Sequence, residues 1–160
     1  MMTVRVIALG RLKEAYLRDA CAEYRKRLQA FCRIEIIELT PQRLPDDPSD
    51  AEIAQALEKE ADDIERHIPS GARVYSLCVE GKQMSSEQFS TDLDKAAVGG
   101  AGTVVFVIGS SFGLSPRIKR RADVRLSVSE MTFPHQLMRV MLLEQLYRAF
   151  QISRGGKYHK

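Results

Sequence analysis

Three short segments of the chain combine residue types that could do chemistry. Residues 109–115 read Gly-Ser-Ser-Phe-Gly-Leu-Ser and directly follow an apolar run. Residues 128–135 read Val-Ser-Glu-Met-Thr-Phe-Pro-His, and residues 154–160 read Arg-Gly-Gly-Lys-Tyr-His-Lys. A glycine-rich loop, a mixed polar and apolar loop and a basic aromatic tail together indicate a small-ligand site beside a contact for an anionic partner.

The glycine-rich segment begins where the apolar run at 103–108 ends. Ligands of open α/β sheets bind beyond the carboxyl ends of the strands, where glycine lets a ligand approach the backbone closely, so Gly109 is a candidate contact. A tight strand-to-helix turn without a ligand explains the same residues. The segment also has the G-x-S-x-G form of a nucleophile elbow, which makes a serine hydrolase using Ser111 an alternative. Against it, Pro116 follows where the helix of such an elbow should begin.

The other two segments offer candidate groups for catalysis and RNA contact. The loop at 128–133 could enclose an adenine ring while its backbone groups read the edge of that ring. His135 is a candidate base or RNA contact, with a structural role in a first helical turn as the alternative. In the tail, two glycines predict mobility, and cations around an aromatic ring suit phosphate contact and base stacking. A frayed chain end is the alternative for the tail.

The charge of the chain is unevenly distributed. The net charge is +3, but residues 117–160 contain 10 Lys and Arg against 3 Asp and Glu, whereas residues 1–116 contain 14 against 18. The C-terminal third thus carries +7 and the rest carries −4. A basic third of this kind is expected to face an anionic partner, although a solvated basic surface has the same composition.

The composition predicts one domain of a cytoplasmic protein. The 160 residues are 44% hydrophobic and 28% charged, which suits one folded α/β domain and neither a disordered chain nor a membrane protein. No signal peptide or membrane-spanning stretch is expected. The three cysteines, Cys21, Cys32 and Cys78, form no C-x-x-C pair, so we expect reduced packing residues and no metal site.

Apolar runs alternate with amphipathic stretches, which is typical of a mostly parallel sheet with helices on both faces. Strands are expected at 4–9, 34–39, 73–79, 103–108 and 124–128. One helical stripe steps by four through Leu12, Tyr16, Ala20, Tyr24 and Leu28, and another runs through Ile53, Leu57, Ala61, Ile64 and Ile68. Capping boxes at Ser49 and Ser85 predict two helix starts, and residues 41–48 form a polar loop.

A last helix is predicted from Pro134 to Phe150. It has one apolar face formed by Leu137, Met138, Met141, Leu142, Leu146 and Phe150, which Val140, Leu143 and Tyr147 widen. A helix that is apolar on more than one side needs more than one partner. The pattern leaves two interpretations of equal weight: the same helix of a second subunit in a twofold dimer, or a central helix of the core.

With these segments in place, the chain resembles a known family. Residues 108–109, 129–136, 144–150 and 154–160 are similar to the large-subunit ribosomal RNA methyltransferase H family of the SPOUT methyltransferases. The similarity extends over the whole chain, including 8–14 and 77–82, and is most specific in the C-terminal third. One position departs from the family, since Ser110 stands where many members have the second residue of a Gly-Gly pair.

The resemblance implies an α/β fold with a C-terminal trefoil knot, and a homodimer that uses S-adenosyl-L-methionine. It implies methylation of N3 of a pseudouridine in a 23S rRNA stem-loop on the ribosome, with no metal and no membrane contact. The implied cofactor residues are Leu77, Gly109, Val128, Ser129, Glu130, Met131, Thr132 and Phe133. The implied catalytic residues are Arg154, Tyr158 and His159, to which we add His135.

Proton removal from N3 needs at most a modest base, because the imide is weakly acidic. His135, Tyr158 and His159 are the candidates for this base, and the sequence does not rank them. A noncatalytic RNA-binding module is a further alternative, which would need the basic tail but not the loop at Gly109.

Overall fold

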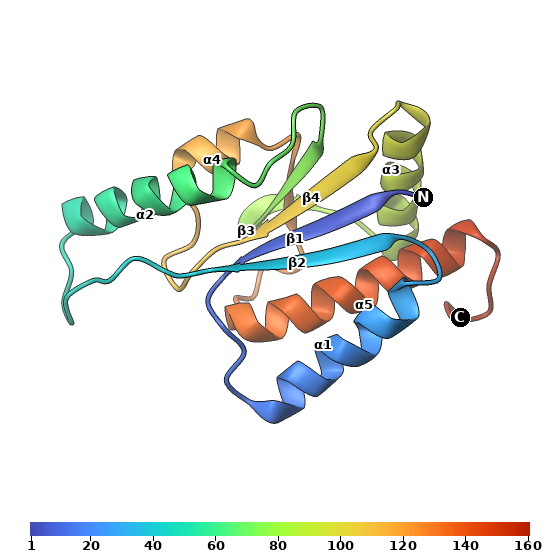
Figure 1. The fold of residues 1–160 in the computed structure, drawn as a ribbon, viewed down its shortest axis with the longest axis horizontal. Coiled ribbons are helices and arrows are strands. Elements are labelled where there is room, and N and C mark those ends of the chain that lie inside the picture. The colour runs from blue at the N-terminus through green and yellow to red at the C-terminus, as the bar shows by residue number, and fades with distance from the viewer.

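A computed structural model describes all residues, 1–160, and contains one five-stranded parallel sheet (Figure 1). The strand order is β2-β1-β4-β3-β5. The strands are β1 (Thr3–Leu9), β2 (Arg33–Leu39), β3 (Arg73–Gln83), β4 (Thr103–Ile108) and β5 (Val124–Ser127). All five predicted strands are therefore present, and the expected α/β class with a parallel sheet is confirmed.

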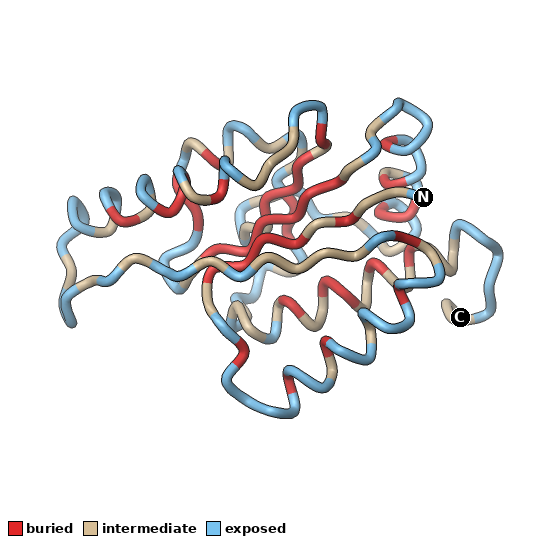
Figure 2. Tube along the Cα trace, in the orientation of Figure 1, coloured by how far each residue is buried: buried red, intermediate tan, exposed pale blue.

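Five helices cover both faces of this sheet, namely α1 (Ala15–Leu28), α2 (Asp50–Glu65), α3 (Ser86–Val98), α4 (Pro116–Arg121) and α5 (His135–Ser153). Side chains of α1, α3 and α5 pack on one face against Val4, Val6, Val104 and Phe106. Those of α2 and α4 pack on the other face against Ile7, Leu9, Val105 and Val107. Neighbouring residues of β1 and β4 thus face opposite layers, and both strands are buried throughout their centres (Figure 2).

Local capping accounts for several helix starts. Both predicted capping boxes are present, with the hydroxyls of Ser49 and Ser85 accepting from the backbone N–H groups of Glu52 and Gln88. Helix α4 was not predicted, because Pro116 was interpreted as an interruption. Instead Pro116 occupies the first turn, where its missing N–H costs nothing, and the Ser115 hydroxyl caps the helix.

The predicted stripe of α1 is correct at Leu12 and Leu28, which are buried, and at Tyr24, which packs against the core, but it is wrong at Tyr16. Tyr16 is 71% exposed, while Leu17, Cys21 and Leu28 are buried in the core. The helix begins only at Ala15. Its buried residues are Leu17, Cys21 four residues later, and Leu28 a further seven residues later. Cys21 and Cys32 are free and buried, which confirms that they are packing residues.

Helix α5 begins at His135, preceded by Pro134, and continues to Ser153, three residues beyond the predicted end. Leu142, Leu143 and Leu146 are buried in the core. Leu143 is 0% exposed within one chain, where α5 packs against α1, α3 and β4, so this residue fits the interpretation of α5 as a core helix. Leu137 is 37% exposed and remains free for other contacts.

The strand order brings three loops together. Since β4 lies between β1 and β3, and β5 pairs with the other side of β3, the carboxyl ends of β3, β4 and β5 are neighbours at one edge. The knotted threading that the resemblance implies stays a prediction, because strand order alone does not define it. None of the helices combines the length and the hydropathy that a membrane span requires.

Candidate cofactor and catalytic site

A pocket of about 840 Å³ lies at the edge where β3, β4 and β5 end. Its walls come from residues 77–80 of β3, from residues 108–114 at and after the end of β4, from Lys119 of α4, and from most residues between 126 and 138. The volume lies within the range of cofactor sites, and half of the lining residues are hydrophobic. The carboxyl edge of a parallel sheet is where such folds bind ligands, so this pocket is the candidate cofactor site.

Most of the predicted cofactor residues line this pocket. Glu130 is the exception, since its side chain is exposed and lies outside the lining. The others are brought together from three strand ends: Leu77, Gly109, Val128, Ser129, Met131, Thr132 and Phe133. Prediction from the sequence missed Cys78, Phe112 and Lys119, which also line the pocket. Cys78 lies within β3 next to Leu77, Phe112 lies in the loop after β4, and Lys119 lies on α4, so only the nearness of Cys78 and Phe112 to predicted site residues was an available signal.

A bulge within β3 forms one wall of the pocket. Leu77 and Lys82 both pair with Leu126 of β5, so the four residues between them leave the ladder. Three of these, Cys78, Val79 and Glu80, line the pocket. The fourth is Gly81, at which a Cβ atom would lie 2.6 Å from the carbonyl oxygen of Arg125. A side chain at position 81 would therefore push β5 away from the bulge.

Gly109 is required by the shape of its own loop. The backbone at Gly109 is not left-handed, but a Cβ atom there would lie 2.3 Å from the carbonyl oxygen of Gly113. Residues 110–113 form a tight turn, in which the Gly113 N–H donates to the Ser110 carbonyl at 2.9 Å. Gly113 itself has φ +84°, which favours glycine. A larger residue at 109 would thus displace the turn, not simply fill ligand space as the sequence suggested.

Two serine hydroxyls stabilise the loop after β5. The Ser127 hydroxyl donates to the Ser129 carbonyl at 3.0 Å, and the Ser129 hydroxyl accepts from the Met131 N–H at 3.0 Å. Met131 is 74% exposed although its side chain is apolar. The loop therefore holds its shape without burying its apolar side chains, which leaves them available to a ligand or to another protein surface.

His135 begins α5 and lines the pocket. Its imidazole lies against Gly10, where Nε2 is 3.5 Å from the position that a Cβ atom would take. Burial and the nearby positive charge of Arg139 lower the pKa of His135. Arg139 is itself buried and donates to Glu38 and to the Gly10 carbonyl. The lowered pKa favours the neutral imidazole, which can accept a proton.

The residues of the C-terminal tail lie away from this pocket. The Tyr158 hydroxyl donates to Glu144 at 2.8 Å, and its ring packs edge-on against Tyr147. The guanidinium of Arg154 lies 4.6 Å from the centre of the Phe31 ring. One chain therefore does not bring Arg154, Tyr158 and His159 together with His135, and the tail packs on α5 instead of fraying.

The contacts of the tail also limit its proton chemistry. Burial and the hydrogen bond to Glu144 raise the pKa of Tyr158, so its hydroxyl stays protonated. Arg148 donates to Nδ1 of His159, because a guanidinium has no acceptor. Nε2 of His159 then carries the proton that it donates to Glu87 at 2.5 Å. In this arrangement His135 is the candidate base that is free to accept a proton.

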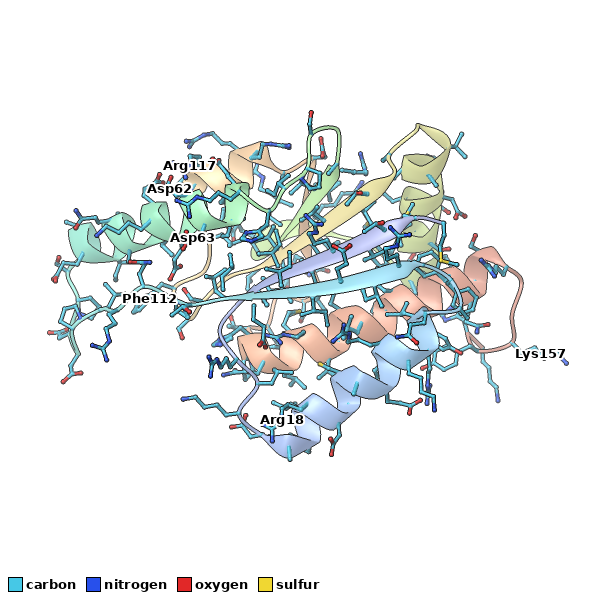
Figure 3. All side chains as sticks on the ribbon, viewed as in Figure 1. Arg18, Asp62, Asp63, Phe112, Arg117 and Lys157 are labelled. Carbon is cyan, nitrogen blue, oxygen red and sulfur yellow. The ribbon has the colours of Figure 1, made fainter.

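The basic third of the chain is partly neutralised within the fold. Arg117 pairs with Glu58, Asp62 and Glu65. Figure 3 labels Arg117 and Asp62 close to each other. Three other cations, Lys119, Arg139 and Arg148, pair with Glu80, Glu38 and Glu144. The exposed cations without a carboxylate partner are Arg120, Arg121, Arg125, Arg154, Lys157 and Lys160. Within the basic third of the chain, the positive charge that is available for contact with RNA therefore lies on α4, β5 and the tail.

Comparison with known proteins decides the family. The chain matches the family described as "Predicted SPOUT methyltransferase" over residues 2–159. The chain belongs to the SPOUT methyltransferase family. Relatives from Streptococcus equi subsp. zooepidemicus, Exiguobacterium sibiricum and Bacillus thuringiensis are 50%, 48% and 48% identical over 159 residues, which is 99% of this chain and 100% of each relative. Each of these relatives is named ribosomal RNA large subunit methyltransferase H.

The geometry of this SPOUT methyltransferase does not form a nucleophile elbow. No residue other than glycine has a positive φ, so Ser111 lacks the strained conformation of an elbow serine. The helix that follows begins five residues later, at Pro116. Ser111 is exposed and has no hydrogen-bonded histidine. The G-x-S-x-G pattern is explained by the tight turn at 110–113.

We predict that Gly109→Ala weakens binding of S-adenosylmethionine about tenfold or more, because the new Cβ atom displaces the turn at Gly113. Gly102→Ala is the matched control, since nothing lies within 4 Å of a Cβ atom there. Titration calorimetry measures the affinity, and circular dichroism checks the fold. A folded Gly109→Ala protein with wild-type affinity would contradict this role of the turn.

We predict that His135 titrates below the ordinary pKa of histidine, as measured by NMR of its ring protons. Because folding lowers this pKa, the contribution of neutral His135 to stability is present above the ordinary value and is lost as the pH falls through the lowered one. Arg139→Met should raise the pKa of His135 by removing a positive charge. A wild-type His135 that titrates at or above the ordinary value contradicts the prediction.

Proposed function

We propose that this protein transfers a methyl group from S-adenosyl-L-methionine to N3 of a pseudouridine in 23S rRNA of the ribosome. The observation that carries the proposal is the pocket at the carboxyl edge of β3, β4 and β5, in a chain that matches the SPOUT family over residues 2–159. The names of the full-length relatives support ribosomal RNA as the substrate. A protein that acts on ribosomes works in the cytoplasm.

The lining of the pocket suits this cofactor. Apolar side chains such as Leu77 and Phe133 can pack on an adenine ring, while backbone groups of the loops at 109–113 and 128–133 offer hydrogen bonds to its edge and to the ribose. When bound, S-adenosylmethionine supplies an electrophilic methyl group. The protein must then align N3 of the base with that methyl group and exclude water from the site.

His135 is the residue that we assign to the N3 proton. It lines the pocket, its pKa is lowered, and neither of its ring nitrogens is hydrogen-bonded within the protein. A neutral imidazole could accept the proton that N3 gives up, and it could later release that proton to water. Tyr158 and Arg154 are left to contact the RNA, by stacking and by charge.

The length of α5 separates the tail from the pocket of its own chain. Helix α5 has 19 residues, so Arg154 lies roughly 28 Å from His135 along the helix axis. The four residues from Arg154 to Tyr158 span at most roughly 14 Å when fully extended. In Figure 3 the labels of Phe112, on the pocket loop, and Lys157, on the tail, lie on opposite sides of the molecule. The contacts of Tyr158 with Glu144 and Tyr147 hold the tail away from the pocket of its own chain.

A twofold dimer overcomes this separation. If two α5 helices pair antiparallel, the beginning of one helix lies beside the end of the other, and each tail lies beside the pocket of the second copy. The exposed Tyr16 and Leu137, from α1 and α5, are apolar surface for such a contact. We propose that the protein is a homodimer whose sites each combine the pocket of one subunit with the tail of the other.

The function is tested with S-adenosylmethionine and ribosomes from a strain that lacks the gene. We expect calorimetry to show cofactor binding, and labelled methyl groups to enter 23S rRNA as N3-methylpseudouridine, mapped by mass spectrometry. His135→Gln should lower turnover by about 10²–10⁴-fold, whereas Ser111→Ala should retain cofactor-dependent methylation. A wild-type protein that binds ribosomes but neither binds the cofactor nor methylates RNA would be a noncatalytic RNA-binding module, and the proposal would fail.

The shared site predicts complementation between two defective subunits. A protein lacking residues 157–160 should bind S-adenosylmethionine normally but lose methyl transfer by orders of magnitude, because RNA contact is lost. Coexpressed with His135→Gln subunits, it should form heterodimers with one intact site. Random pairing then restores about a quarter of the wild-type sites.

Two purified homodimers mixed without subunit exchange are the control for this experiment, and light scattering reports the oligomeric state. A tail that acts within its own chain gives no recovery in the heterodimers. A truncated protein with wild-type turnover would instead assign RNA contact to Arg120, Arg121 and Arg125.

A further inference from the structure

A buried carboxyl group lies beneath the pocket loop. Glu60, on α2, is 4% exposed and forms no ion pair in the protein. Removing a carboxyl group from water is costly unless hydrogen bonds replace the lost solvent. Glu60 has two such bonds: its Oε2 accepts from the backbone N–H of Gln42 at 2.9 Å, and its Oε1 accepts from the Ser110 hydroxyl at 3.2 Å.

These two bonds connect three segments that are distant in the sequence. Gln42 belongs to the loop between β2 and α2, and Ser110 is the second residue of the pocket loop after β4. Ser110 lines the pocket, whereas Glu60 does not. Glu60 therefore lies behind the pocket wall. It contacts that wall through the side chain of Ser110, which lines the pocket.

The internal shape of the pocket loop and its placement depend on different contacts. Within the loop, the Ser110 carbonyl accepts from the Gly113 N–H, and Gly109 packs against the Gly113 carbonyl. Neither contact fastens the turn to the helical layer beside it. The bond from Ser110 to Glu60 is the side-chain hydrogen bond that ties this turn to α2.

We propose that Glu60 is a positioning residue for the cofactor: by holding Ser110 against α2, it keeps the turn at 110–113 where S-adenosylmethionine binds. This inference rests on the proposed function, because it takes that cofactor as the ligand of the pocket. Glu60 acts through Ser110 and touches neither the cofactor nor the RNA. Its loss should therefore raise the KM for S-adenosylmethionine much more than it lowers kcat at a saturating concentration.

The same helix provides a matched control. Glu58 lies two residues earlier on α2, is exposed, and pairs with Arg117 at 3.4 Å. Glu58→Ala thus removes a carboxyl group from the same helix and a contact to α4, but leaves Ser110 untouched. Glu60→Gln is the conservative variant, because its amide can still accept from Gln42 and can donate to the hydroxyl oxygen of Ser110.

Titration calorimetry with S-adenosylmethionine on the purified full-length variants tests the proposal, alongside denaturant unfolding. We expect about a tenfold weaker affinity for Glu60→Ala, a smaller loss for Ser110→Ala, and no change for Glu58→Ala. Glu60→Gln should retain most of the affinity. The double variant Glu60→Ala/Ser110→Ala should have the same affinity for S-adenosylmethionine as Glu60→Ala alone, because the two residues act through one bond.

Three results would overturn the assignment: wild-type affinity in folded Glu60→Ala, equal losses in Glu58→Ala and Glu60→Ala, or additive effects in the double variant. If Glu60→Ala does not fold, Ser110→Ala and Glu60→Gln test the proposal in its place. Wild-type affinity in Ser110→Ala then contradicts the proposal. A wild-type protein that does not bind S-adenosylmethionine would instead reject the proposed function, so the two failures are distinguishable.

Discussion

The insertion of β4 between β1 and β3 is the constraint on which the rest of the structure depends. Parallel pairing on both sides buries Val104, Phe106 and Ile108 against one helical layer and Val105 and Val107 against the other. Strand β4 thus packs against both helical layers and has no exposed face, as does its neighbour β1. The carboxyl end of that strand is held at the centre of the sheet, and the pocket loop begins there.

The pocket combines a rigid centre with apolar edges. The turn at 110–113 is held by close contacts between backbone atoms, and the loop after β5 is held by two serine hydroxyls. Contacts within the protein thus define the shape of both loops, which lowers the entropic cost of binding a ligand. Met131, Val128 and Phe112 nevertheless remain exposed around the opening, and this apolar surface is available to a nucleobase or to a second subunit.

Electrostatics divide the basic third of the chain into structural and available charges. Arg139 is buried inside the fold. It joins α5 to β2 through Glu38, and it joins α5 to the loop after β1 through the carbonyl of Gly10. Arg148 is held by Glu144, and the same carboxylate receives the Tyr158 hydroxyl. These pairs order the tail on α5, so the remaining cations of the tail are presented from a fixed surface. Phosphate contact then requires less ordering of the chain when RNA binds.

Much of this architecture could be predicted from local patterns. Strand positions followed from apolar runs, the starts of α2 and α3 from capping boxes, and the α/β class from the alternation of the two. Each of these depends on residues that are close in the sequence. The core face of α1 could not be assigned in this way, because Leu17 and Tyr16 are both apolar and only packing on the sheet distinguishes them.

The candidate site shows the same division. The composition of segments 109–115 and 128–135 indicated that they belong to a ligand site. Most of the predicted cofactor residues line one pocket. That Leu77 joins them depends on the pairing of β3 with β5, which no local pattern encodes. The role of Glu60 was equally hidden, because a glutamate on an amphipathic helix is usually solvated and only the approach of Ser110 buries it. Chemistry at one position is a property of the residue type, whereas contact between distant positions is decided by strand order and by the length of α5.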